Sequence, residues 1–342
     1  SAWWTPSTTW DFCGADPMRS PFTPGTERPC HYRELFVASS GDVYPCCLTW
    51  NKPALRIGHI TDTDLETRLL AFDGSCRCSS FTLRKGAPSD EREYKLNVET
   101  GLACNGRCAM CCVNAPSSHS PYLYYGELDR LIETLPAINH MVVQGGEVLI
   151  QKKTMEWLRA LSLRRPEIPL ALITNGNVEA DMVPFVESLF FNVLISVYGF
   201  QDETYRSITR MELEKTRRFA ELLVTRSKTT VHLKYLVTPL NLHELPLFLR
   251  WAIALGPETI SVIDSNTALY INSDTPDRYW SVILERTGRA VRSVLSGESD
   301  RLAGSGTVVL LDALSREMFG LDQGFVEEAG LADTVLPNPM VG

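Results

Sequence analysis

The chain lacks the long apolar segments that a membrane protein needs. No stretch of its 342 residues approaches the roughly eighteen consecutive apolar residues of a membrane-spanning helix. Its first residues, Ser1-Ala-Trp-Trp-Thr-Pro, show neither the basic segment nor the apolar segment of a signal peptide. At 44% hydrophobic residues the chain can bury a large core, and its length favours two domains. We therefore expect a globular protein of the cytoplasm that does not bind membranes.

The chain also lacks an excess of positive charge. It has 33 Lys and Arg against 41 Asp and Glu, which gives a net charge of -8. Binding nucleic acid requires basic patches that neutralise phosphates, so this balance disfavours a nucleic-acid partner. Neither an internal repeat nor a low-complexity tract is visible. A small-molecule partner that is neutral or cationic fits the composition better.

Cysteine, in contrast, is abundant and clustered. The chain has ten cysteines, and without an export signal they indicate metal ligands rather than a disulfide framework. Cys104, Cys108 and Cys111 lie on one short loop after the apolar segment 94–99. Three thiolates could bind zinc with a fourth ligand, or an iron-sulfur cube with one iron left open.

Further motifs follow this loop, each at the end of an apolar segment. Residues 141–147 read Met-Val-Val-Gln-Gly-Gly-Glu, and residues 170–176 end in Thr-Asn-Gly. Residues 193–198 end in Ser-Val-Tyr, and the segment 202–210 ends in Arg. The loop and these motifs, in this order along the chain, resemble those of the radical S-adenosylmethionine (SAM) superfamily.

The resemblance implies a role for each motif. The three cysteines would hold a 4Fe-4S cluster whose open iron binds SAM, while Gly145, Gly146 and Glu147 would seat the amino group of SAM. The remaining SAM contacts would come from Thr174, Asn175, Ser196, Tyr198 and Arg210. Reductive cleavage of SAM would then yield a 5'-deoxyadenosyl radical that removes hydrogen from a substrate carbon.

The periodicity of residues 93–264 predicts an α/β fold. Short apolar runs alternate with amphipathic ones, as in a parallel sheet with helical crossovers. The predicted strands are 94–99, 140–144, 170–174, 193–198, 231–238 and 259–264. The predicted helices are 126–135, 153–163, 178–189, 212–226 and 241–255. Together with the resemblance, this indicates a partial (β/α)6 barrel with its motifs at the carboxyl ends of the strands.

A second group of thiols precedes the barrel. A strand at 34–38, a turn containing Gly41 and a return strand ending at Cys46 form a hairpin pattern. This pattern, with Cys30, Cys76 and Cys78, resembles the SPASM or twitch extension, in which four cysteines hold an auxiliary 4Fe-4S cluster. The final pair is spaced by one residue rather than two, and the region precedes the barrel rather than following it. A zinc site remains the alternative here.

These patterns predict three domains. Residues 1–92 would form the small amino-terminal iron-sulfur domain, and residues 93–270 the radical SAM barrel. Residues 271–342, with a helix predicted over 278–295 and an irregular tail from 321, would form a helical cover.

The outcome of the reaction depends on the cysteines that neither cluster uses. These are Cys13, Cys47 and Cys112, and packing as small apolar side chains is the default interpretation of each. A thiol can return a hydrogen atom to a carbon radical, and Cys47 is our first candidate for this catalytic role, with Cys13 second. We therefore predict an epimerase that acts on a carbohydrate-containing small molecule of natural-product type, as in antibiotic biosynthesis.

Several alternatives stay open. An auxiliary cluster that accepts an electron would make the enzyme a dehydrogenase of a sugar or cyclitol alcohol, and a ribosomally made peptide is the rival substrate. No winged-helix domain for binding a leader peptide is evident before the barrel. A zinc-binding interaction protein is the alternative from another class. A radical SAM enzyme also needs an electron donor, such as flavodoxin or ferredoxin.

Overall fold

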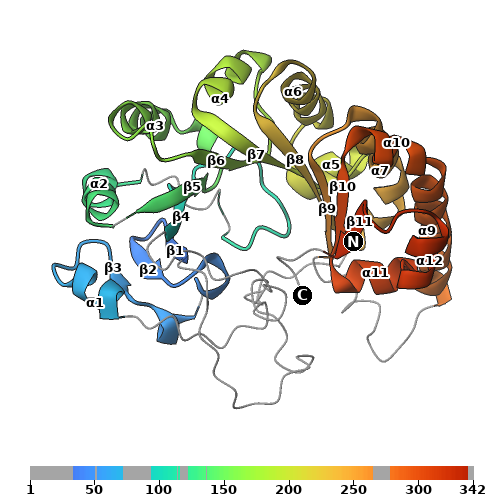
Figure 1. The fold of residues 1–342 in the computed structure, drawn as a ribbon, viewed down its shortest axis with the longest axis horizontal. Helices are drawn as coiled ribbons and strands as arrows, with labels where there is room; N and C mark the ends of the chain where they lie inside the picture. Colours follow the sequence, from blue (N-terminus) through green and yellow to red (C-terminus); the bar gives the residue numbers. More distant parts are fainter. Residues whose placement is uncertain are drawn as a thin grey trace.

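The computed structural model describes residues 34–50, 52–71, 94–113, 115, 122–135, 137–264 and 278–337. Strands and helices alternate through most of this part of the chain (Figure 1). The strands are β1 (Glu34–Val37), β2 (Asp42–Tyr44), β3 (Gly58–His59), β4 (Tyr94–Glu99), β5 (Ile138–Gln144), β6 (Leu170–Thr174), β7 (Phe190–Val197), β8 (Thr230–Val237), β9 (Thr259–Asp264), β10 (Val308–Leu311) and β11 (Val335–Pro337). The helices are α1 (Leu65–Ala71), α2 (Tyr125–Thr134), α3 (Lys152–Arg164), α4 (Val183–Leu189), α5 (Asp202–Thr209), α6 (Leu213–Arg226), α7 (Leu245–Leu255), α9 (Arg278–Gly297), α10 (Ser299–Ser305), α11 (Ala313–Phe319) and α12 (Gln323–Glu328).

The described strands form a single sheet with the order β11-β10-β9-β8-β7-β6-β5-β4-β1-β2-β3. From β4 to β11 every neighbouring pair is parallel, and β1 pairs with β4 in the same sense. Among the described strands, only the pairs β1–β2 and β2–β3 are antiparallel. The strands follow an arc that stays open, with helices on its outer side (Figure 1). This is the predicted partial barrel.

The two faces of the sheet differ in character. On β8, for example, Val231, Leu233, Tyr235 and Val237 all belong to the large apolar core that also contains helical residues. Because successive side chains of a strand point to opposite faces, the residues between them line the inner side of the arc. Helices thus cover the outer face, and the inner face is free to carry chemistry.

All six predicted barrel strands form, and β4, β6 and β9 match the predicted residues at both ends. Helix α5 was missed, because its sequence was interpreted only as a family motif. The tail from 321 was predicted to be irregular, and this prediction is wrong for α12 and β11.

The carboxy-terminal part is therefore not only helical. β10 pairs with the open edge of β9, and β11 pairs with β10. A strand of three or four residues has too little periodicity to be recognised, and it forms here because the edge of an existing sheet offers its hydrogen-bonding groups. None of the helices in the described part of the chain combines the length and apolar character that crossing a bilayer requires.

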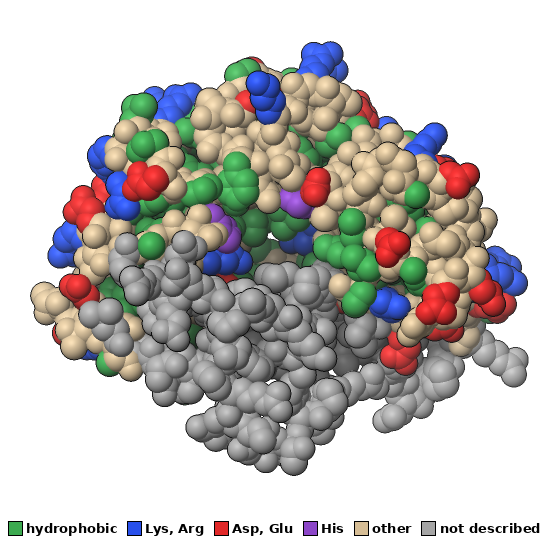
Figure 2. Space-filling model, viewed as in Figure 1, with side chains coloured by type: hydrophobic (Ala, Val, Ile, Leu, Met, Phe, Trp, Pro, Cys, Tyr) green, Lys and Arg blue, Asp and Glu red, His purple; other side chains and the backbone are tan. Residues whose placement is uncertain are grey.

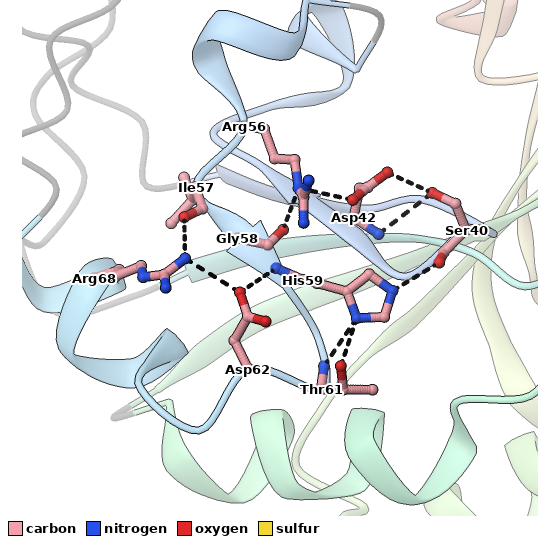
Figure 3. A network of polar contacts seen from close by, with 9 residues as sticks. All are labelled: Ser40, Asp42, Arg56, Ile57, Gly58, His59, Thr61, Asp62 and Arg68. Atoms are coloured by element: carbon pink, nitrogen blue, oxygen red, sulfur yellow. Dashed lines mark hydrogen bonds and ion pairs between the residues drawn. The ribbon is translucent and has the colours of Figure 1, made fainter.

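The amino-terminal hairpin continues the barrel sheet through the pairing of β1 with β4. A polar network holds the hairpin to its surroundings (Figure 3). Arg56 Nε lies 2.8 Å from Asp42 Oδ1, and His59 Nε2 lies 2.9 Å from the carbonyl oxygen of Ser40. Gly41 lies in the turn with φ of 91°, a left-handed conformation in which glycine avoids strain. The network thus joins β2 and the turn to β3 and α1, while the pairing of β1 with β4 holds the hairpin beside the first barrel strand.

Candidate functional site

The loop with three cysteines follows β4 and is held from two sides. On one side, the N–H groups of Gly146 and Glu147 donate to the carbonyls of Gly101 (2.7 Å) and Ala103 (2.8 Å), so the end of β5 supports the start of the loop. On the other side, the N–H of Arg107 donates to the carbonyl of Thr209 at 2.7 Å, at the end of α5. Backbone contacts therefore fix the position of the loop.

The three thiols of this loop influence one another electrostatically. Burial is the main cause of a raised pKa for Cys104, to about 11, and for Cys108, to about 12, with the neighbouring cysteines adding to both shifts. Backbone N–H groups point at two of the sulfurs: Gly106 at Cys104 Sγ (3.3 Å) and Ala115 at Cys111 Sγ (3.3 Å). Such donors stabilise charge on sulfur, which a cluster ligand requires.

These residues fit an iron-sulfur cube. In a cube each thiolate binds a different iron, so the sulfurs need only face a common space. Among the described residues, no three His, Cys, Asp or Glu side chains converge closely enough to hold one metal ion. Cluster assembly must remove the protons that burial favours on Cys104 and Cys108.

Glycine is required at 145 and 146 because the cysteine loop passes so close. A Cβ added to Gly145 would lie 2.5 Å from the carbonyl oxygen of Gly101, and one added to Gly146 would lie 2.3 Å from that of Ala103. The backbone of the cysteine loop is by itself a sufficient reason for glycine at both positions.

Glu147 is buried and connects two strand ends. Its carboxylate accepts hydrogen bonds from the N–H of Leu149 (3.0 Å), the hydroxyl of Thr174 (2.8 Å) and the N–H of Asn175 (2.8 Å). Burial nevertheless raises its pKa. A carboxylate can accept about four hydrogen bonds, so three donors leave capacity for one more. The SAM amine remains the predicted fourth donor.

Asn175 joins the strand end to the cysteine loop. Its side-chain amide donates to Asn105 Oδ1 at 2.9 Å and lies 3.8 Å from Cys104 Sγ. Asn175 thus lies beside Cys104. The roles of Thr174 and Asn175 in SAM binding stay predictions.

Ser196 and Tyr198 come from the end of β7. Burial, and then the nearby Cys108, raises the pKa of the Tyr198 phenol, while the Ser196 side chain acts in the opposite direction. Arg210 differs from the other predicted SAM contacts because its side chain is exposed. It ends α5 in the left-handed conformation, with φ of 62°. Its role in SAM binding stays a prediction.

The predicted auxiliary site is described only in part. Cys46 is buried after β2, and its thiol lies 3.9 Å from Thr49 Oγ1. The other predicted ligands, Cys30, Cys76 and Cys78, lie outside the described residues, as does Cys13.

Cys47 lies on the inner side of the sheet. It packs with Trp50 against a small apolar cluster of Phe36, Ala38 and Tyr44, separate from the main core. Its N–H donates to Glu34 Oε1 at 3.2 Å. Burial, followed by the charge of Glu34, raises the pKa of the thiol.

Cys112 was expected to pack as a buried thiol, and this expectation is wrong because its side chain is exposed. Sequence reasoning also missed Lys234, a basic residue on the inner face of β8. The alternation of polar and apolar residues over 230–237 could have identified Lys234 as an inner-face residue.

The match to known families agrees with this geometry. Residues 98–252 match the family model of the Radical SAM superfamily, and residues 30–69 match SPASM, an iron-sulfur cluster-binding domain. The second match includes Cys30 and Cys46 and ends before Cys76 and Cys78. With the three cysteines on one loop beside the ends of β5 and β6, the chain contains a radical SAM domain, and a SPASM domain precedes it.

The relatives match only parts of this chain. A GTP 3',8-cyclase from Nautilia profundicola is 33% identical over 95 residues, which make up 25% of this chain and 30% of the cyclase. Streptococcus suis SuiB bound to SAM is 11% identical, with a TM-score of 0.49, over 64% of this chain and 51% of SuiB. A structure of anSMEcpe with bound AdoMet is 18% identical, with a TM-score of 0.47, over 64% of this chain and 63% of that protein. The chain thus spans less than two thirds of each.

Membership defines the cofactors: a 4Fe-4S cluster with SAM in the barrel, and an auxiliary iron-sulfur cluster in the SPASM domain. The residues described above fit the first cluster. The individual ligands of both clusters remain predictions.

Proposed function

We propose that this radical SAM enzyme inverts one carbon of a carbohydrate-containing small molecule. The observation that carries the proposal is the position of Cys47 on the inner side of the sheet, packed against Phe36, Ala38 and Tyr44. Phe36 pairs with Asn97 of β4, so this cluster lies on the polar inner face rather than on the face that the helices cover. A thiol in that position can reach a substrate held within the arc.

Each part of the protein has a separate task in this proposal. When bound, the reduced cluster and SAM supply the radical that removes a hydrogen atom from the substrate carbon. The protein holds that carbon in place and excludes water. The S–H bond of Cys47 then breaks homolytically, and its hydrogen atom forms a new C–H bond on the opposite face. One electron from a reduced flavodoxin or ferredoxin, with one proton from solvent, regenerates the thiol.

The substrate class has two supports. Polar side chains line the inner face, including Gln144, Ser196 and Lys234, and such a wall suits a substrate rich in hydroxyl groups. The relative matched over 95 residues is named for GTP, a nucleotide that contains a sugar.

Turnover in deuterium oxide tests the proposal. The assay would contain anaerobic protein, SAM, reduced flavodoxin and a panel of sugars, nucleotide sugars and peptides, with products identified by mass spectrometry and NMR. Because thiol protons exchange with solvent, we expect one deuterium on the inverted carbon and one SAM consumed per product. Cys47→Ala should still cleave SAM without inverting the substrate, whereas Cys112→Ala should invert it.

Dehydrogenation is the second candidate, because a SPASM cluster could accept the electron of the substrate radical. A product two hydrogens lighter, without solvent deuterium, would establish it and contradict the role of Cys47. A modified peptide as the product would contradict the proposed substrate class.

A further inference from the structure

Lys234 lies on the inner face of the barrel between two serines. Its neighbours Leu233 and Tyr235 are in the core behind the sheet, so the Lys234 side chain points the other way. The strand register places it beside Ser196 of β7 and beside Ser261 of β9. Three adjacent strands thus place a lysine between two serines on the same face of the sheet.

The ammonium group of Lys234 has no hydrogen bond or ion pair with any described residue, although other inner-face charges are paired. Lys95, for comparison, lies 3.7 Å from Glu34 Oε2. Lys234 keeps part of its surface accessible, yet burial lowers its pKa, and the nearby Cys112 thiol only partly opposes this shift. A side chain that is partly accessible but surrounded by little water is expected to line an internal hollow. A desolvated charge without a partner is unfavourable, so a bound anion would stabilise it.

His232, two residues earlier on the same face, provides an independent observation. Its Nδ1 lies 2.7 Å from Thr259 Oγ1, while its Nε2 is buried and has no hydrogen-bonding partner among the residues that the structure describes. Buried ring nitrogens are normally paired, and an unpaired one indicates a group that completes the site. Figure 2 shows the surface hollowed in the middle of the arc, with histidine and basic side chains on its wall.

We propose that Lys234, flanked by Ser196 and Ser261, binds an anionic group of the substrate, either a phosphate or a carboxylate. Lysine suits this role as a compact point charge, and the two hydroxyls can donate to further oxygens of the same group. The inference rests on the proposed function, because it takes the substrate to be a small molecule held within the arc. It narrows the substrate class to a sugar that carries a negative charge.

The carboxylate of SAM is the other anion in this enzyme. Its amine and carboxylate are on the same carbon, and the predicted amine site, Gly145 to Glu147, follows β5. Lys234 is on β8, three strands away, a separation of about 14 Å along the sheet at the usual strand spacing. One amino acid group cannot contact both places, so the geometry favours the substrate as the ligand of Lys234. Ser196, which is also a predicted SAM contact, would then lie where SAM and the substrate meet.

Calorimetry on anaerobically reconstituted protein loaded with SAM tests the proposal without turnover. The probes are pyrophosphate for a phosphorylated sugar, glucuronate for a carboxylated one, and glucose as the neutral control. We expect pyrophosphate or glucuronate to bind, and Lys234→Met to weaken that binding about tenfold or more. Lys234→Arg should retain much of it, and Lys153→Met, on the exposed surface of α3, should match the wild type.

Three results would overturn the proposal. The wild type could bind neither anion, Lys234→Met could bind them unchanged, or the loss could affect SAM alone, in which case the lysine serves the SAM carboxylate. Iron content and circular dichroism show whether Lys234→Met folds. If Lys234→Met does not fold, Lys234→Arg tests the requirement for a positive charge at this position. Calorimetry measures binding without catalysis. The anion-binding proposal can therefore fail or succeed independently of the deuterium experiment on Cys47.

Discussion

The backbone N–H of Asn175 donates to a carboxylate oxygen of Glu147 over 2.8 Å, which joins the ends of β5 and β6. The Asn175 side chain continues the connection to Asn105 and to Cys104 Sγ. Glu147 also supports the cysteine loop directly, since its N–H donates to the carbonyl of Ala103. Two predicted SAM-binding motifs and the cysteine loop are thus parts of one hydrogen-bonded unit.

Glu147→Gln should weaken SAM binding about tenfold or more, because an amide cannot offer a charged partner to the SAM amine. It should also lower the free energy of unfolding by about 1–3 kcal/mol, since one end of the amide is a donor that faces donors. Equilibrium binding of SAM and chemical denaturation measure the two effects. Iron content should not change, and Glu133→Gln, on the surface of α2, is the control. If SAM affinity is unchanged, a group other than Glu147 binds the SAM amine.

Gly146→Ala should displace the cysteine loop, because the new methyl group would lie 2.3 Å from the carbonyl oxygen of Ala103. We expect a loss of cluster absorbance after reconstitution, together with a lower melting temperature. Gly126→Ala is the matched control, since a Cβ at that exposed position in α2 meets nothing within 4 Å. It should leave the cluster intact and stabilise the protein by about 0.5–1 kcal/mol. Full iron content in Gly146→Ala would mean that the loop can move without losing its cluster.

Replacing Cys104, Cys108 and Cys111 with Ala should remove about half of the iron and all formation of 5'-deoxyadenosine, because the SPASM cluster has its own ligands. Iron analysis and chromatography of SAM products measure both. Cys112→Ala, which changes an exposed thiol next to this loop, should behave as the wild type. Reductive cleavage of SAM by the triple variant would disprove the assignment of the cluster.

Iron and sulfide analysis of the anaerobic protein should give close to two cubes per chain, one in the barrel and one in the amino-terminal region. Cys46→Ala should lose the second cube, since Cys46 is a predicted ligand, while Cys47→Ala should retain it. Metal analysis that finds one cube and one zinc would establish zinc in the amino-terminal region.

Much of the site could be predicted because its motifs are local. The spacing of Cys104, Cys108 and Cys111 and the glycines before Glu147 are visible along the chain, and the alternation of apolar runs placed each motif at a strand end. The exposure of Cys112 could not be predicted, because it depends on how the loop packs on α5. The strands β10 and β11 were missed for a similar reason, since they form on the edge of β9.

The sequence by itself determined the class of chemistry, because cluster ligands and strand-end motifs are short patterns whose residue types are set by what they bind. The tertiary structure decided which side chains share a space. It placed Cys47 on the inner side of the sheet and aligned Lys234 with Ser196 and Ser261. These residues are far apart along the chain, and only the register of neighbouring strands brings them together. The physical reason is that strand pairing depends on hydrogen bonds and on packing against the helices, which local sequence does not specify.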